Sequence, residues 1–112
     1  MDELQILRAE IDKIDARLVE LFCRRMEVTE QVGRCKLERG LPVLDRAREA
    51  QVLANKTALA PEGRGDDVTA LFESIMSLSR RQQQRLMAGD SAPSWLAELN
   101  AAIAGARAPL EQ

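Results

Sequence analysis

Apolar side chains recur at alternating intervals of three and four residues along the first third of the chain. They stand at Leu4, Leu7, Ile11, Ile14, Leu18, Leu21, Val28, Val32 and Cys35. This spacing is typical of a helix seam that packs against another helix, and it predicts a helix from Asp2 to about Glu38. At 1.5 Å per residue this helix is roughly 50 Å long. A compact domain of this chain length has a radius of gyration of only about 13 Å. We therefore expect a homodimer in which two long helices cover one another's seams.

A second helix is predicted after a short loop. Gly40 and Pro42 interrupt the helical pattern, and Asp45 follows in a position suited to an N-cap. The apolar pattern then extends to about Leu59, after which Pro61 and two glycines end it. These signals predict a helix that begins just after Asp45 and stops at about residue 59.

Asp66 or Asp67 is placed to cap a third helix that ends near Met87. Its apolar face comprises Val68, Leu71, Phe72 and Ile75, with Met76 and Leu78 beside it. Beyond it, residues 90–93 resemble a linker, and Ser94 is placed to cap a short amphipathic helix containing Trp95. We therefore divide the chain into a three-helix domain, residues 1–88, and a C-terminal segment, residues 89–112.

Composition agrees with an all-α fold. The 112 residues leave room for one domain, and a hydrophobic content of 46% with only 3% aromatic residues favours aliphatic packing between helices over a sheet. The 16 basic and 18 acidic side chains are interspersed, so there is no electrostatic footprint for nucleic acid. No apolar run reaches the length of a membrane span, and the amphipathic pattern already includes Leu4 and Leu7. We therefore expect a cytoplasmic protein with neither a nucleic-acid nor a membrane partner.

Several polar residues occupy positions where the pattern requires apolar ones. Arg25 interrupts the seam of the first helix, and a buried guanidinium is costly unless a negative, hydrogen-bonded group meets it. Lys36 follows eleven residues later, almost three full turns, so both side chains point the same way and can converge on one small anion. Arg8 lies near this face too. It is about 25 Å along the helix from Arg25, too far for both to hold one small molecule from a single chain.

The other two helices show the same departure from the pattern. On the third helix the apolar stripe continues as Ser79 and Gln83, four residues apart on one face. On the second helix Arg48 shares a face with Val52 and Leu59, which predicts an inward-leaning guanidinium. The carboxylates of Asp45 and Glu49 flank Arg48 one turn apart.

Each of these signals also has a simpler interpretation. Arg25 can fix helix register, and Arg48 can belong to a surface ion-pair cluster. Ser79 and Gln83 can mark the point where a helix emerges into solvent. Lys36 can complement a helix dipole. Taken together, however, the polar positions favour one cavity among three helices, which is where helical bundles build ligand sites.

The candidate cavity lacks the usual parts of acid-base, nucleophilic and metal catalysis. The chain has no histidine and no tyrosine, neither cysteine has a basic partner at helical spacing, and no acidic or Cys cluster has metal-ligand spacing. We expect neither a cofactor nor a metal. Fixed cations and amide donors remain, which suit holding a dianion in one shape and stabilising charge that develops on an oxygen. A unimolecular rearrangement fits this set.

At these positions the chain resembles the all-helical chorismate mutases, which form intertwined homodimers and convert chorismate to prephenate. The resemblance covers residues 4–86 and rests on the segments LRAEID, RRMEVTEQVGRCK, PVLDRAREAQVL and ALFESIMSLSRRQQ. The connection between the second and third helices is shorter than in the family. The family has little to say about residues 90–112.

The resemblance implies a role for each polar residue. Arg25 and Arg48 would hold the substrate carboxylates, joined by Arg8 from the second subunit. Lys36 and Gln83 would bond the ether oxygen, and Glu49 the ring hydroxyl. The backbone near Asp45 and the Ser79 hydroxyl would complete the pocket.

Two rival functions remain open at this stage. An isochorismate-pyruvate lyase on the same fold would use a similar set of cations, although the arrangement of Asp45, Arg48 and Glu49 resembles the mutases. A non-catalytic helical dimerisation or regulatory module would use the polar seam to set register. The sequence also leaves open a partner enzyme of the shikimate pathway, within one polypeptide or through the C-terminal segment.

Overall fold

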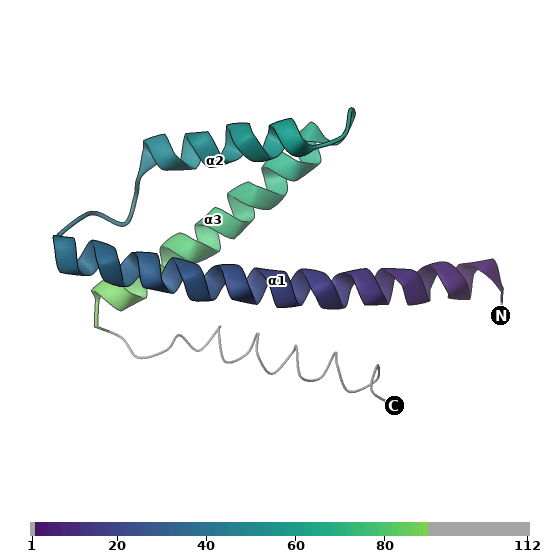
Figure 1. Ribbon diagram of the computed structural model, residues 1–112, viewed down its shortest axis with the longest axis horizontal. Coiled ribbons are helices and arrows are strands. Elements are labelled where there is room, and N and C mark those ends of the chain that lie inside the picture. The colour runs from purple at the N-terminus through teal and green to yellow at the C-terminus, as the bar shows by residue number, and fades with distance from the viewer. Residues whose placement is uncertain (1, 90–112) are drawn as a thin grey trace. The chain divides into compact units, whose positions relative to one another are not determined.

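The protein is all-α in a computed structural model that describes residues 2–89. Three helices make up most of this region: α1 (Glu3–Arg39), α2 (Arg46–Leu59) and α3 (Gly65–Met87) (Figure 1). The prediction of one long, one short and one medium helix is confirmed. The short C-terminal helix expected around Trp95 lies outside the described residues. Within residues 2–89, no helix is long and apolar enough to cross a membrane.

Local hydrogen bonds explain both ends of α1. Asp2 Oδ1 accepts from the backbone N–H of Gln5 at 2.8 Å, and Gln5 Oε1 accepts from the N–H of Asp2 at 3.3 Å, a reciprocal capping box. At the other end Gly40 has φ of 66°, a conformation that costs glycine little. The N–H of Gly40 donates to the carbonyl of Leu37, and the N–H of Leu41 to that of Lys36. This is the Schellman arrangement, and it ends α1 where the sequence predicts.

The two shorter helices begin differently from one another. Asp45 is the N-cap of α2, as predicted, and its Oδ1 accepts from the backbone N–H of Arg48 at 3.0 Å. The prediction for the start of α3 is wrong by two or three residues, because Arg64, rather than Asp66 or Asp67, occupies the N-cap position, without a side-chain capping bond. Asp66 and Asp67 lie inside the first turn, where their negative charge still complements the helix dipole.

The described residues fall into two compact units, residues 2–28 and residues 29–89. In the second unit α2 and α3 pack against each other along an interface that contains the buried side chains of Val52 and Met76 (Figure 1). The Thr57 and Thr69 hydroxyls meet at 2.6 Å between these two helices. Leu71, predicted on the apolar face of α3, is half exposed, whereas Phe72 and Ile75 are partly covered as expected.

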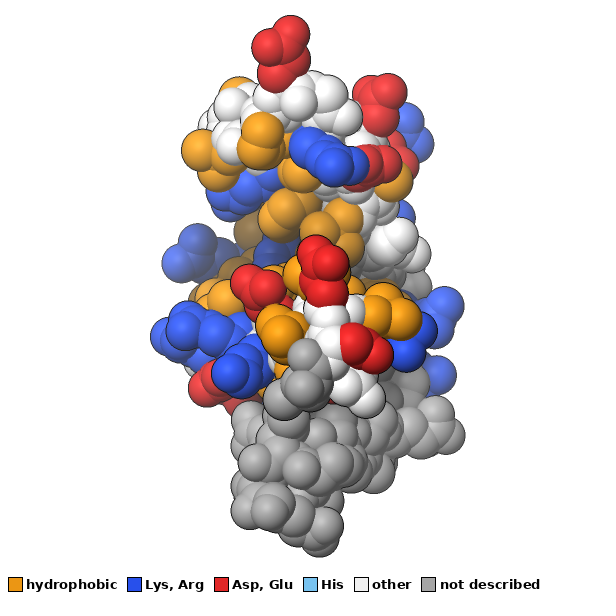
Figure 2. All heavy atoms as spheres, turned by 90° about the vertical axis from the view of Figure 1, so that its right-hand side faces the viewer, with side chains coloured by type: hydrophobic (Ala, Val, Ile, Leu, Met, Phe, Trp, Pro, Cys, Tyr) orange, Lys and Arg blue, Asp and Glu red, His pale blue; other side chains and the backbone are white. Residues whose placement is uncertain are grey.

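Helix α1 carries apolar side chains on more than one face. Met26, which the heptad pattern does not include, is only 1% exposed. The seam residues from Leu4 to Val32 are instead between 42% and 57% exposed in the single chain. Figure 2 shows one face of the molecule, on which hydrophobic side chains lie at the surface among charged ones. A chain with this much exposed aliphatic surface is expected to have a partner.

Candidate functional site

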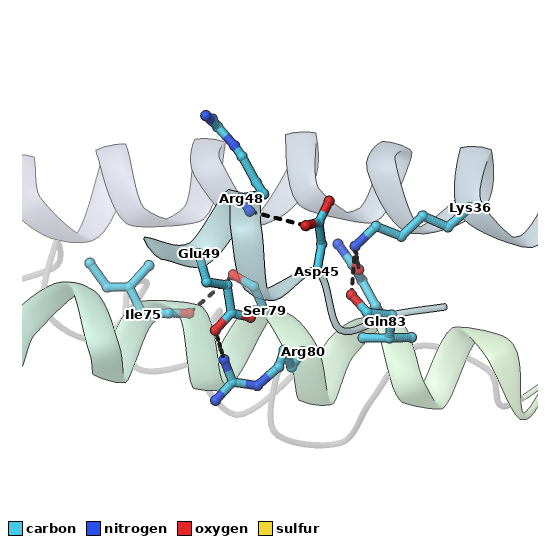
Figure 3. A network of polar contacts seen from close by, with 9 residues as sticks. Lys36, Asp45, Arg48, Glu49, Ile75, Ser79, Arg80 and Gln83 are labelled. Carbon is cyan, nitrogen blue, oxygen red and sulfur yellow. Dashed lines mark hydrogen bonds and ion pairs between the residues drawn. The ribbon is translucent and has the colours of Figure 1, made fainter. Parts of the chain in front are cut away.

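Lys36 and Gln83 form the centre of a polar cluster in the unit of residues 29–89. The Lys36 ammonium, in the last turns of α1, donates to Gln83 Oε1 at 2.9 Å and to the backbone carbonyl of Val43 at 2.7 Å (Figure 3). The first bond joins α1 to α3, and the second holds the connection between α1 and α2. An ammonium has three N–H groups. The bonds to Gln83 and Val43 use two of them, so one N–H of Lys36 remains for a ligand.

Gln83 is held from both ends of its amide. Its Oε1 accepts from Lys36, and its Nε2 donates to the backbone carbonyl of Thr29 at 2.9 Å. The side chain is buried, with 5% of its surface exposed. An amide nitrogen carries two N–H groups, so one remains after the bond to Thr29. Lys36 and Gln83 can therefore each offer one N–H to a shared acceptor.

Gly33 allows α1 and α3 to approach closely at this point. A Cβ atom on Gly33 would lie 2.9 Å from Gln83 Cγ and 3.1 Å from Leu86 Cδ2. Both separations are shorter than ordinary van der Waals contact. The absence of a side chain at Gly33 is therefore what permits Gln83 to lie against α1.

Ser79 also faces inward, since it is only 8% exposed. Its hydroxyl donates to the carbonyl of Ile75 at 3.0 Å, one turn earlier on α3 (Figure 3). The interpretation in which Ser79 and Gln83 mark emergence into solvent is wrong, because both side chains are buried. The polar continuation of the apolar stripe lies in the interior of this unit.

Asp45 and Arg48 are both exposed at the start of α2. The Arg48 guanidinium donates to Gln51 Oε1 at 2.8 Å, and its side chain extends away from Lys36 and Gln83 (Figure 3). The expectation that Arg48 leans inward with Val52 and Leu59 is wrong for this structure, and Leu59 itself is 77% exposed. The orientation of a long side chain depends on which hydrogen-bond acceptor lies within its reach. Helical spacing alone does not reveal that acceptor.

Glu49 points between α2 and α3, where it meets a residue that the sequence analysis missed. Arg80 Nη1 donates to Glu49 Oε1 at 2.5 Å, forming an ion pair between the two helices (Figure 3). The two side chains are partly covered, with exposed fractions of 32% for Arg80 and 24% for Glu49. A charge-assisted bond of this kind fixes the orientation of the carboxylate more firmly than a neutral one.

Thr29 and Gln82 were also missed. The Thr29 hydroxyl donates to Gln82 Oε1 at 2.8 Å, and Gln82 is 4% exposed. One signal was available for Thr29: with Gly33 and Lys36 it follows the spacing of a single helix face. The spacing of the α3 stripe places both residue 82 and residue 83 on the inward face and residue 84 off it, as the burial of Gln82 and Gln83 and the exposure of Gln84 show.

Arg8 and Arg25 belong to the other unit, residues 2–28, and are described with it. Arg8 is exposed, and Arg25 is partly buried. Seventeen residues of continuous helix separate them, or about 25 Å, as the sequence analysis expected. Among residues 2–89, no group of three or more His, Cys, Asp and Glu side chains is arranged to hold a metal ion.

The fold and this cluster of fixed N–H donors define a helical protein suited to binding an anion with an acceptor oxygen. The sequence profile of the family described as chorismate mutase type II matches residues 7–84. The chain belongs to this family. The match includes every residue of the cluster, from Thr29 to Gln83.

Curated relatives are consistent with this membership. The chain is 43% identical over 53 residues to the T-protein of Haemophilus influenzae, covering 47% of this chain and 14% of that protein. It is 36% identical over 62 residues to the intracellular chorismate mutase of Mycobacterium tuberculosis, covering 55% of this chain and 59% of that protein. It is 29% identical over 94 residues to the 4-amino-4-deoxychorismate mutase of Streptomyces pristinaespiralis, covering 82% of this chain and 73% of that protein. No solved structure gives a significant match.

Proposed function

We propose that the protein is a chorismate mutase, an isomerase that rearranges chorismate to prephenate in phenylalanine and tyrosine biosynthesis. Family membership and relatives named as chorismate mutases support this activity. The observation that carries the proposal is the contact between Lys36 and Gln83, in which both residues retain an N–H for one acceptor. That acceptor is the ether oxygen of the substrate.

The reaction is a pericyclic shift in which the ether C–O bond breaks as a C–C bond forms, with no proton transferred. Negative charge gathers on the ether oxygen in the transition state. The Lys36 ammonium and the Gln83 amide stabilise it, and they need no reorganisation because other bonds already hold them in position. The site requires neither a general base nor a cofactor.

Binding of the two substrate carboxylates is assigned to arginines. Arg25 and Arg48 hold the carboxylates of one pocket, with Arg8 contributed by the second subunit of a homodimer. Arg48 changes rotamer on binding, leaving Gln51. These contacts fix the extended enolpyruvyl ether in its folded, reactive conformer.

The exposed seam of α1 supports the homodimer. The eight seam residues from Leu4 to Val32 are 42% to 57% exposed in the single chain. A second copy of the same helix covers such a seam by two-fold symmetry. The distance of about 25 Å between Arg8 and Arg25 along the helix then assigns them to different pockets.

The remaining contacts complete the pocket. Glu49 accepts a hydrogen bond from the ring hydroxyl, and the Ser79 hydroxyl and the backbone near Asp45 line the same pocket.

Residues 1–88 form the mutase domain, and residues 89–112 are a separate segment that takes no part in the chemistry. The match spans only 14% of the T-protein, and our proposal includes a partner enzyme of the shikimate pathway, either within one polypeptide or through residues 89–112.

One alternative substrate has a specific observation in its favour. The relative from Streptomyces pristinaespiralis, of which the match covers 73%, is named for a substrate with an amino group in place of the ring hydroxyl. The other rivals are an isochorismate-pyruvate lyase and a non-catalytic helical module. Chorismate is our primary assignment because Glu49 is already paired with a cation.

Direct assay of the purified protein separates these functions. We expect loss of chorismate absorbance with formation of prephenate, and a fall in kcat on the order of 10²-fold in Lys36→Ala. Arg34→Ala is the matched control: Arg34 lies two residues away on α1, exposed and paired with Glu30, and its removal leaves kcat unchanged. Salicylate and pyruvate from isochorismate would indicate the lyase instead. If saturating chorismate changes neither the rate nor the melting temperature, the non-catalytic module is favoured.

A further inference from the structure

The ion pair between Arg80 and Glu49 lies in the same polar cluster as Lys36 and Gln83. Arg80 directly follows Ser79 on α3 and precedes Gln83 by three residues, and Glu49 lies one turn after Asp45 on α2 (Figure 3). Among the described residues, Arg80 Nη1 donates to Glu49 Oε1. The guanidinium therefore reaches the site through the carboxylate of Glu49.

This pairing restricts the geometry of Glu49. A free glutamate side chain samples many rotamers, whereas a charge-assisted bond to a partly covered guanidinium selects one. A carboxylate has about four acceptor positions, so Glu49 can accept a ligand hydrogen bond while it remains bonded to Arg80. The pair thus presents a fixed acceptor to a hydroxyl donor.

The pairing also changes what the carboxylate attracts. An unpaired carboxylate favours a cationic ligand group through its charge, in addition to accepting a hydrogen bond. When Arg80 compensates that charge, the attraction for a cation is offset by repulsion from the guanidinium nearby. The ability to accept a hydrogen bond from a neutral hydroxyl remains.

We propose that Arg80 is a positioning residue that sets substrate preference: through Glu49 it selects a ring hydroxyl over a protonated amine. An alkyl amine is cationic near neutral pH, so an amino group in place of the hydroxyl brings a positive charge toward the Arg80 guanidinium. This inference rests on the proposed function, because it assigns the ring substituent to Glu49. It adds a residue on α3 to the determinants of specificity.

The test compares two substrates, chorismate and its analogue with an amino group in place of the ring hydroxyl. The ratio of kcat/KM values for the two compounds is measured for the unaltered protein, Arg80→Met, Arg80→Lys and Arg81→Met. Arg80→Met is expected to lower the preference for the hydroxyl by about tenfold or more, because it leaves the Glu49 charge uncompensated. Arg80→Lys restores most of the preference. Arg81→Met, an exposed neighbour on the same helix, leaves it unchanged.

A double variant shows whether Arg80 acts through Glu49. In Glu49→Gln the carboxylate charge is gone, and adding Arg80→Met should then have little further effect on the ratio.

If Arg80→Met lowers both kcat/KM values equally, its role is purely structural and the proposal is overturned. If Arg80→Met does not fold, Arg80→Gln takes its place with the same expected ratio. An unaltered protein that turns over neither compound overturns the proposed function, and this preference with it.

Discussion

Replacing Gly33 with alanine should impair catalysis far more than it impairs stability. The new Cβ would lie 2.9 Å from Gln83 Cγ and 3.1 Å from Leu86 Cδ2, so Gln83 must move by several tenths of an ångström. That movement stretches its 2.9 Å bonds to Lys36 and to the Thr29 carbonyl. The two donors assigned to the ether oxygen then no longer converge.

The change in stability is small because two effects oppose each other. Overpacking of this kind costs about 1 to 3 kcal/mol. Alanine gains about 1 kcal/mol over glycine within a helix. We therefore expect the free energy of unfolding to fall by no more than about 2 kcal/mol. A displacement of about 1 Å at a reacting centre costs about 10²-fold in rate, so a displacement of several tenths of an ångström at Gln83 should lower kcat by about tenfold.

The assay pairs chorismate turnover with urea unfolding. Gly65→Ala is the control, because Gly65 is also helical but its Cβ would meet Thr57 Cγ2 at an ordinary 3.4 Å. It should retain full kcat and unfold at the same or a higher urea concentration. A Gly33→Ala protein with unaltered kcat would refute the reasoning, since it would show that the position of Gln83 does not matter. A protein that unfolds without denaturant would refute the estimate of stability.

Three further predictions concern the dimer and the chemistry. Ile14→Glu places a charge on the exposed seam of α1 and should yield monomers in sedimentation; an unchanged dimer would locate the interface elsewhere. Arg8→Ala and Lys36→Ala homodimers should each be nearly inactive. Unfolding and refolding the two variants together should restore about a quarter of the original activity. Half of the refolded dimers are then mixed, and one of the two pockets in each mixed dimer is intact. A mixture with only the average parental activity, although mass measurement detects mixed dimers, would contradict an inter-subunit site. The chain has no histidine, and the proposed rearrangement transfers no proton, so kcat should be constant from about pH 6 to pH 8. A bell-shaped profile within this range would argue for a proton transfer.

Helix boundaries were predictable where a local side chain or a glycine determines them. Asp45 caps α2 through its own carboxylate, and Gly40 ends α1 through a positive φ. Both effects act within a few residues and are visible in the sequence. The start of α3 was predicted less accurately, because Arg64 occupies the cap position where Asp66 and Asp67 are better cappers. The N–H of Arg64 donates to the carbonyl of Pro61, and this turn leads directly into α3.

The two apolar faces of α1 were harder to distinguish by sequence alone. The heptad pattern places Leu7 and Leu18 on one stripe, and both side chains are about half exposed in the single chain, whereas Met26 lies on a neighbouring face and is buried. A helix with apolar surface on adjacent faces produces a pattern in which the stronger periodicity hides the weaker one. Burial in a single chain distinguishes them, and spacing does not.

The polar cluster was partly predictable for a related reason. Buried polar residues that interrupt an apolar stripe, such as Ser79 and Gln83, stand out against the expected period. The positions of the Arg48 and Arg80 guanidinium groups could not be predicted in this way, because a long flexible side chain reaches whichever acceptor lies nearest. For Arg48 that acceptor is Gln51, one turn along the same helix. For Arg80 it is Glu49, which only the packing of α2 against α3 brings within reach.

The bond from Lys36 to the Val43 carbonyl limits how the connection between α1 and α2 can change in length. This connection runs from Gly40 to Asp45, and its only tie to the ammonium among the described contacts is that carbonyl. Surface loops usually tolerate insertions. An inserted residue here would instead displace the carbonyl that steadies Lys36. Engineered extensions or fused peptides are therefore better placed in the turn between α2 and α3, which has no such bond to Lys36 among the described residues.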